Sequence, residues 1–339
     1  MKNLLITGSA GFIGSNFVNY FFNKYPEYKL INIDSLTYAG ELSNINDSIH
    51  KDPRFELIEA DIRDLAVVQS IFEKYKIEGV IHFAAESHVD NSIMNPSVFL
   101  ETNVLGTFNI LQASRELWIN DRFEYKSEFK GCRFYHISTD EVYGSLDLES
   151  EDIFTEQSVI KPSSPYSASK AASDMLVNSF YHTYGLDTLI SNCSNNYGPN
   201  QHDEKLIPTI IRNALRGQEI PIYGDGKNVR DWLYVLDHCK AIDKVFHLGK
   251  SGEVYNIGGN TEKNNLDIVY KVCELLESNV PTSKPYRDLI TFVSDRPGHD
   301  KRYAIDATKI ENELGFIPET SFEDGLEKTI MWYCSKYKN

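Results

Sequence analysis

Short apolar runs alternate with helical patterns through residues 1–193 of this chain. The expected strands are residues 4–7, 30–34, 55–61, 80–84, 134–138 and 189–193. The expected helices are residues 12–22, 65–75, 98–117 and 167–184. Because strands that alternate with helices are joined by right-handed crossovers, this order predicts an α/β fold with a doubly wound parallel sheet that helices cover on both faces.

The pattern changes near residue 194, where segments become shorter and richer in Gly, Pro and Asn. We expect residues 194–228 and 259–339 to form mainly a smaller α/β domain that binds the substrate. Residues 229–258 are expected to pack back onto the first domain. The polar segment 119–131 predicts a surface loop before the fifth strand.

Three glycines, Gly8, Gly11 and Gly14, follow the first expected strand and open the first helix. This spacing allows a tight turn and a close backbone approach to a pyrophosphate at a helix N-terminus. Asp34 ends the second strand, and a carboxylate there accepts hydrogen bonds from ribose hydroxyls and repels a 2′-phosphate. Residues 1–193 are therefore predicted to be a Rossmann-type domain that binds NAD in preference to NADP.

Two further strand ends are expected beside this cofactor. Asp61 and Ile62 follow the third strand and would lie next to the adenine, although Asp61 could instead cap the next helix. Phe83, Ala84 and Ala85 follow the fourth strand, where small side chains would let the backbone pass close to the cofactor. The alternative is that the two alanines only pack in the core.

Tyr166 and Lys170 are four residues apart in SPYSASK, a spacing that places them on one face of a helix. A phenol normally titrates near pH 10, so it is a poor base at neutral pH. A lysine ammonium and the positive nicotinamide ring would both lower the pKa of Tyr166 and make it a usable base. The alternative is an ordinary Tyr–Lys pair on a solvated helix face.

The fifth strand ends in STDEVYG, which places Thr139, Asp140 and Glu141 at the edge of the sheet that faces the ligand crevice. Thr139 can hydrogen-bond a sugar hydroxyl. Oxidation of an alcohol needs no carboxylate pair, so an adjacent acid and base suggest an additional elimination. A solvated turn or a helix cap is the alternative for the two carboxylates.

These motifs, together with HFAAESHVDNS, CSNNYGP, EKLIP, YGDGKNVRDWLYVLDH and DRPGHDKRYAID, identify a resemblance over nearly the whole chain. The sequence resembles the nucleotide-sugar 4,6-dehydratases of the extended short-chain dehydrogenase/reductase superfamily. The resemblance implies that Tyr166 takes the C4 hydroxyl proton of an NDP-hexose, most directly dTDP-glucose, while NAD takes the C4 hydride. Glu141 then removes the C5 proton, Asp140 protonates the departing C6 hydroxyl, and the hydride returns to C6. The cofactor would remain bound through turnover.

The resemblance also assigns binding residues by motif. Those expected at the cofactor, besides the glycines, Tyr166 and Lys170, are Phe12, Ile13, Asp34, Ser35, Leu36, Thr37, Asp61, Ile62, Phe83, Ala84, Ala85, Ser87, Thr102 and Asn196. Those expected at the sugar or the nucleotide diphosphate are Ser87, Thr139, Asn195, Lys205, Leu206, Pro221, Tyr223, Arg230, Asn265, Arg296 and His299. For the two arginines, surface ion pairs with Asp231 and Asp295 are the alternative.

Three positions depart from the family pattern: Asn91 replaces an arginine, Glu41 an asparagine, and NQHD (200–203) a segment with an aromatic and a proline. None touches the catalytic motifs. They keep UDP-hexose or another NDP-hexose open as the substrate. The alternative enzyme is a nucleotide-sugar 4-epimerase, in which the two carboxylates would have no role. The alternative from a different class is a non-catalytic NAD-binding protein.

Composition limits the kinds of molecule that the chain is expected to bind. The net charge is −15, which argues against a nucleic-acid binder. No apolar run is long enough to span a membrane, and the N-terminus lacks the features of a signal peptide. The five widely spaced cysteines form no metal-ligand pattern and suggest buried thiols in a cytoplasmic setting. The resemblance implies a homodimer that pairs through the helix before the fifth strand and the Tyr166 helix.

Overall fold

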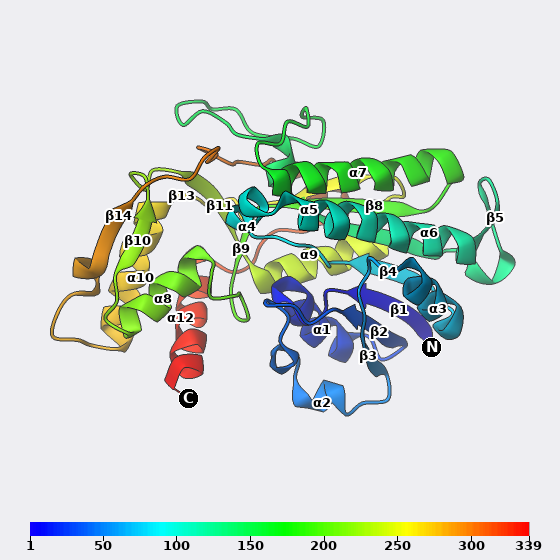
Figure 1. The fold of residues 1–339 in the computed structure, drawn as a ribbon, viewed down its shortest axis with the longest axis horizontal. Coiled ribbons are helices and arrows are strands. Elements are labelled where there is room, and N and C mark those ends of the chain that lie inside the picture. The colour runs from blue at the N-terminus through cyan, green and yellow to red at the C-terminus, as the bar shows by residue number, and fades with distance from the viewer. Residues whose placement is uncertain (339) are drawn as a thin grey trace.

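The computed structural model describes residues 1–338, and a seven-stranded parallel sheet forms its centre (Figure 1). The strands are β1 (Lys2–Thr7), β2 (Tyr28–Asp34), β3 (Phe55–Glu59), β4 (Gly79–His82), β7 (Arg133–Thr139), β8 (Thr188–Cys193) and β12 (Val254–Ile257). Their order is β12-β8-β7-β4-β1-β2-β3, and every neighbouring pair is parallel. The predicted doubly wound α/β fold is confirmed.

Helices cover both faces of this sheet because each buries an apolar stripe against it (Figure 1). One face carries α1 (Phe12–Lys24), α9 (Val235–Leu248) and α11 (Thr308–Leu314). The other carries α3 (Leu65–Tyr75), α6 (Thr107–Trp118) and α7 (Pro165–Tyr184). Helix α7 begins with Ser164 and Ser167 in a reciprocal capping box and Pro165 at its first turn, which together fix the start of the Tyr166 helix.

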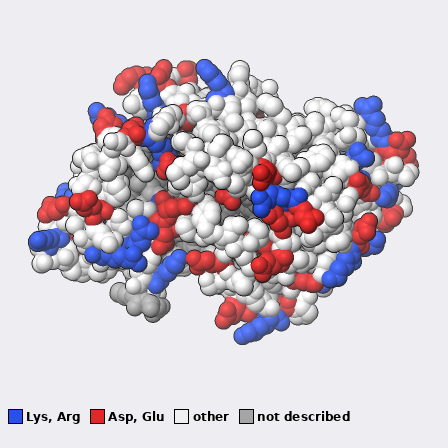
Figure 2. Space-filling model, in the orientation of Figure 1, with Lys and Arg blue, Asp and Glu red and all other residues white. Residues whose placement is uncertain are grey.

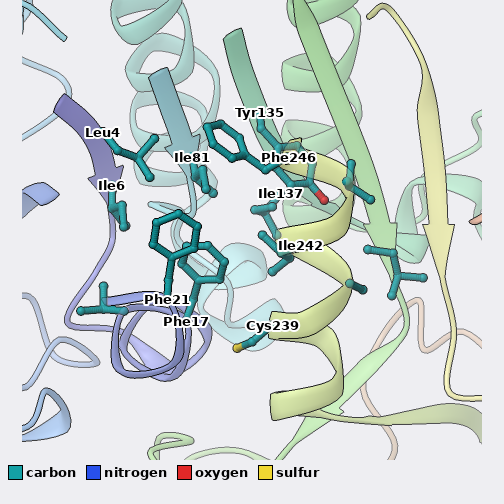
Figure 3. Close-up of a cluster of buried hydrophobic side chains, with 14 of the residues drawn as sticks. Leu4, Ile6, Phe17, Phe21, Ile81, Tyr135, Ile137, Cys239, Ile242 and Phe246 are labelled. Carbon is teal, nitrogen blue, oxygen red and sulfur yellow. The ribbon is translucent and has the colours of Figure 1, made fainter. Parts of the chain in front are cut away.

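The core on the first face is dense in aromatic and aliphatic side chains. Figure 3 shows Phe17 and Phe21 of α1 packed between the strands and Ile242 of α9. The rings of Phe17 and Phe21 stack with centroids 5.1 Å apart. Residues 235–257 thus belong to the central layer, through α9 and the edge strand β12.

A second group of elements lies beside the carboxyl ends of the strands, on the left in Figure 1. A three-stranded sheet, β13-β11-β9, and a two-stranded sheet, β10-β14, pack with three helices around one apolar cluster. The strands are β9 (Asn195–Tyr197), β10 (Ile220–Tyr223), β11 (Val229–Tyr234), β13 (Glu262–Asn264) and β14 (Ile290–Val293). The helices are α8 (Leu206–Leu215), α10 (Asn265–Asn279) and α12 (Phe322–Lys338).

The connections hold the remaining short elements. The short helices are α2 (Asp47–His50), α4 (Val89–Met94) and α5 (Pro96–Phe99), and the 3₁₀ turns are η1 (Leu42–Asn44), η3 (Ser127–Phe129), η4 (Asp140–Tyr143) and η5 (Tyr286–Leu289). The segment predicted as a loop before the fifth strand instead contains a small hairpin, β5 (Ile119–Asp121) and β6 (Glu124–Tyr125), followed by η3. The predicted helix 98–117 is three consecutive helical segments, because the π-helical η2 (Leu100–Gly106) separates α5 from α6.

Two expected strands are shorter than predicted. The third ends at Glu59 rather than residue 61, and the fourth ends at His82 rather than residue 84. In both cases the chain leaves the sheet to line the cavity described below. All five cysteine side chains are buried, as predicted. Acidic and basic side chains are interspersed over the surface in Figure 2. Within residues 1–338, no helix combines the length and the apolar character needed to cross a bilayer.

Candidate active site

A cavity of about 570 Å³ lies at the carboxyl ends of the central strands. It brings together most of the residues that the sequence assigned to the cofactor and to catalysis. These are Gly8, Gly11, Phe12, Ile13, Gly14, Asp34, Ser35, Thr37, Asp61, Ile62, Phe83, Ala84, Ala85, Ser87, Thr102, Thr139, Asp140, Glu141, Tyr166, Lys170, Asn195, Asn196 and Lys205.

The turn between β1 and α1 requires glycine at two of its three positions. A β-carbon at Gly14 would lie 2.1 Å from the carbonyl oxygen of Gly8, and one at Gly8 would lie 2.7 Å from the backbone nitrogen of Ala84. Gly8 also has a φ of +69°, which side chains disfavour. No side chain caps the start of α1 at Gly11, and the first turn of α1 lines the cavity, which suits an anion at this helix N-terminus.

Asp34 stands at the end of β2 and is only 8% exposed. Its Oδ2 accepts a hydrogen bond from the Ala10 N–H at 2.8 Å, and its Oδ1 accepts one from the Leu36 N–H at 2.9 Å. Each carboxylate oxygen has a further lone pair, which suits the two hydroxyls of a ribose. The glycine cradle and this carboxylate therefore fit NAD. Leu36 itself, with a φ of +48°, lies outside the cavity lining.

Asp61 does not cap the following helix. Its carboxylate lies 2.6 Å from the guanidinium of Arg63, whereas Asp64 caps α3 by accepting the Val67 N–H. The hydrogen bonds from Arg63 lower the pKa of Asp61. Arg63 also lines the cavity, and the sequence analysis did not single it out. Its position two residues after a strand-end acid was the available signal.

The turn η4 positions the two adjacent carboxylates. Thr139 caps it by accepting the Glu141 N–H at 3.3 Å, and Asp140 is 1% exposed. Burial, followed by the charges of Glu141 and Asp231, raises the pKa of Asp140 well above its usual value. Burial also raises the pKa of Glu141, but Arg230 and Lys205 oppose that rise. The two neighbours therefore have different proton affinities, as an acid and a base require.

Tyr166 and Lys170 are both buried on the inner face of α7. The Thr139 side chain hydrogen-bonds that of Tyr166 and favours its phenolate. Burial and the charge of Glu141 nevertheless raise the pKa of Tyr166 well above 10. The lowering expected from Lys170 together with the nicotinamide ring stays a prediction. The Lys170 ammonium donates to the Ile137 carbonyl oxygen, at 2.9 Å.

The other predicted substrate residues lie outside the cavity lining, in the second group of elements. They are Leu206 at the start of α8, Pro221 and Tyr223 in β10, Arg230 in β11, Asn265 at the start of α10, and Arg296 and His299 after β14. Arg230 and Arg296 both lower the pKa of Glu141, so their charges act on the catalytic turn. Lys205 reaches the same region and donates to the Ser87 carbonyl oxygen at 2.9 Å.

Neither arginine forms the surface ion pair that was the alternative reading. Arg230 is 8% exposed and donates to the Asp300 carbonyl oxygen at 2.8 Å, while Asp231 accepts two backbone N–H groups. Arg296 pairs with Asp90 of α4 at 3.3 Å, not with its neighbour Asp295. Asp295 instead contacts His299, with 2.6 Å between the carboxylate and the ring Nδ1.

Sequence reasoning missed two acids in the cavity lining, Glu86 and Glu204. Glu86 follows β4 and is held through its backbone by Asn103 of η2, which accepts its N–H at 2.8 Å. Glu204 raises the pKa of Tyr38 by its charge and a hydrogen bond, after the larger effect of burial. Both acids lie within quoted motifs, HFAAESHVDNS and EKLIP, which was the only signal available.

Comparison with known proteins identifies a family that has this architecture. The family model described as GDP-mannose 4,6 dehydratase matches residues 5–329. The chain belongs to this family. It is 52% identical to the dTDP-glucose 4,6-dehydratase of Salmonella typhimurium, an alignment that covers 98% of this chain and 92% of the relative. The resemblance that the motifs indicated is confirmed.

Solved structures of this family have the same fold. The dTDP-glucose 4,6-dehydratase of Streptomyces venezuelae, crystallised with NAD bound, aligns with a TM-score of 0.88 at 44% identity over 99% of this chain and 98% of that one. A UDP-glucose 4-epimerase from Thermotoga maritima aligns with a TM-score of 0.84 at 28% identity, over 99% of each chain. The fold is therefore shared with epimerases, and the residues at the site must distinguish the two reactions.

Proposed function

We propose that this chain catalyses the NAD-dependent dehydration of dTDP-glucose to its 4-keto-6-deoxy sugar nucleotide. The observation that carries this proposal is the pair Asp140 and Glu141, which lines one cavity with Tyr166 and the glycine turn. A reaction limited to oxidation and reduction at C4 has no use for an acid–base pair beside the tyrosine. The names of the relatives at about half identity support the same reaction.

Tyr166 and Thr139 act at C4 of the sugar. The Thr139 hydroxyl holds the C4 hydroxyl, and the phenolate oxygen of Tyr166 accepts its proton. Bound NAD accepts the hydride from C4 and later returns it to C6. The glycine turn and Asp34 bind and orient the dinucleotide.

Glu141 and Asp140 perform the elimination in this proposal. The 4-keto group acidifies the C5 proton, which the Glu141 carboxylate removes and later returns. Asp140 gives its proton to the departing C6 hydroxyl, which leaves as water. The raised pKa of Asp140, caused first by burial, keeps that proton available, while Arg230 and Lys205 favour the ionised base at Glu141.

The nucleotide diphosphate is assigned to the second group of elements, which includes β11 as well as most of residues 194–228 and 259–339. Arg230 and Arg296 offer forked donors for phosphate oxygens, and Tyr223 offers a ring face to the base. The remaining assigned contacts are Asn195, Lys205, Leu206, Pro221, Asn265 and His299. The departures at Asn91, Glu41 and residues 200–203 make the nucleotide the part of the proposal that most needs direct measurement.

We also propose a homodimer in the cytoplasm. Leu100 and Leu105 of η2 and Met175 of α7 are 55%, 46% and 58% exposed, and the two helical segments pack side by side. Large apolar side chains gathered on one helical layer support pairing with the same layer of a second copy.

The experiment is incubation of the purified protein with dTDP-, UDP-, CDP- and GDP-hexoses without added NAD, followed by mass spectrometry. The proposal expects that the wild type removes one water from dTDP-glucose and that the Glu141→Gln variant removes none. Water loss from another nucleotide sugar alone would replace the substrate but keep the reaction. An unchanged mass with inverted C4 would establish epimerisation and reject the roles of both carboxylates.

A further inference from the structure

Behind Tyr166, the Lys170 ammonium belongs to a chain of buried polar groups that the reaction described above does not use. Its Nζ lies 3.2 Å from Nε2 of His136 on β7. The same Nε2 lies 3.4 Å from Oδ1 of Asp174, one helical turn after Lys170 on α7. Oδ2 of Asp174 accepts the Ser138 hydroxyl at 2.9 Å.

All the members of this chain are buried. Lys170, His136 and Asp174 are 3%, 1% and 7% exposed. Within residues 1–338, Asp174 Oδ1 accepts no hydrogen bond, although it lies 3.4 Å from Nε2 of His136. A buried lysine and carboxylate contribute little net stability compared with apolar residues of the same shape, because the cost of desolvating both charges offsets their attraction. Their presence beside a catalytic tyrosine therefore calls for a role other than holding the fold together.

The titratable groups that surround Asp174 and Lys170 come from several elements. Lys170 shares its helix, and His136 reaches it from β7. Behind His136 lies His82 of β4, with 5.3 Å between the two ring centroids. Tyr143 of η4 faces the carboxylate, and Cys193 of β8 faces the ammonium. Lys170 is thus the cation in this group, since burial keeps both imidazoles neutral by lowering their pKa values.

We propose that Asp174 is a positioning residue for the dehydration: its carboxylate, one helical turn after Lys170 and against the same edge of His136, keeps the Lys170 ammonium charged one turn from Tyr166. A charged lysine at that position favours the phenolate that must accept the C4 proton. The electrostatic effect of Asp174 on Lys170 has the direction that this role requires. Burial lowers the pKa of Lys170 to about 8, and Asp174 is the largest of the influences that oppose this fall. This inference rests on the proposed function.

The test is Asp174→Asn, which removes the charge, keeps the shape and can still accept the Ser138 hydroxyl. The pH dependence of Lys170 reactivity, measured by lysine labelling and peptide mass spectrometry, reads the charge on the ammonium without relying on turnover. We expect the pKa of Lys170 to fall below about 8 in the variant. We also expect kcat at pH 7 to fall by about tenfold with KM little changed, because a rise of roughly one unit in the pKa of Tyr166, which titrates far above pH 7, lowers its phenolate fraction about tenfold. Asp174→Glu should restore part of both.

Asp243→Asn is the matched control. Asp243 is also a buried, helix-borne carboxylate beside a lysine and a histidine, at 2.6 Å from Lys24 and 2.8 Å from His247, but it lies where α1 ends, away from the cavity. It should lower the melting temperature without moving the pH profile or Lys170 reactivity. The inference is overturned if Asp174→Asn leaves both readouts unchanged, or if both variants shift them equally. Absence of dehydration in the wild type would instead reject the proposed function.

Discussion

The guanidinium of Arg296 lies over the ring of Tyr223, with its central carbon 4.8 Å from the ring centroid. The two residues come from the segment after β14 and from β10, and Asp90 of α4 contacts the same guanidinium at 3.3 Å. Arg296 is therefore held between the ring of Tyr223 on β10 and the carboxylate of Asp90 on α4. This arrangement presents a fixed fork to the diphosphate assigned to it.

Arg296→Lys is expected to raise KM by about tenfold, because lysine loses the forked hydrogen bonds and the planar stacking on Tyr223. The effect on kcat should be smaller, since the residue contacts no reacting atom. Arg287→Lys is the control, because Arg287 also lies over a tyrosine ring, that of Tyr270, but it belongs to η5 and is not assigned to the diphosphate. Steady-state kinetics test this prediction. An unchanged KM in Arg296→Lys would show that Arg296 does not bind the diphosphate.

Gly14→Ala is expected to damage the fold and the retained cofactor together. The new β-carbon would lie 2.1 Å from the Gly8 carbonyl oxygen, which no side-chain rotation relieves. Overpacking of this kind costs about 1–3 kcal/mol. Gly11→Ala places its β-carbon at an ordinary 3.4 Å from the same oxygen, so its melting temperature should stay close to that of the wild type. Equal melting temperatures in the two variants would show that the turn is not tight at Gly14.

Asp140→Asn is expected to raise stability while it abolishes most of the dehydration. Burial raises the pKa of Asp140, so its ionisation opposes folding. The stabilisation that comes from the protonated carboxyl is complete below the ordinary value of about 4 and is lost as the pH rises through the raised pKa. The melting-temperature advantage of the variant should therefore be larger at pH 9 than at pH 5. An advantage that shrinks with rising pH would contradict the assignment of Asp140 as the protonated acid.

Met175→Asp is expected to convert the proposed dimer to a monomer, because a charge would be placed in the centre of the apolar layer on η2 and α7. Ile317→Asp is the control, since Ile317 is 57% exposed and Met175 is 58% exposed, and Ile317 lies outside both segments. Analytical ultracentrifugation at micromolar concentration gives the answer. A wild type that is already monomeric there would reject the dimer.

The fold could be predicted because buried parallel strands appear as apolar runs in the sequence and the strand ends carry the ligand residues. The predicted start and end of the helix 65–75 match α3 without adjustment. The π-helical segment η2 could not be predicted, since an apolar pattern does not reveal where the backbone hydrogen bonds change register. The strand β12 was assigned only to a segment that returns to the first domain, and its place at the sheet edge depends on long-range pairing with β8.

The site was predictable where a motif supplies its own geometry, as in the glycine turn and the Tyr166–Lys170 helix. It was not predictable where two elements meet. The contact of Lys170 with His136 joins residues 34 positions apart, and nothing in either local pattern signals it. The same limit applies to the stacking of Arg296 on Tyr223, which depends on the pairing of β10 with β14.

The central claim is that one retained cofactor oxidises C4 and reduces C6 while Asp140 and Glu141 remove water between the two steps. Incubation with dTDP-glucose that carries deuterium at C4, without added NAD, tests it most directly by mass spectrometry and NMR. The account predicts a product that has lost one water and carries the deuterium at C6. Deuterium returned to C4 with no loss of water, or lost to the solvent, would contradict it.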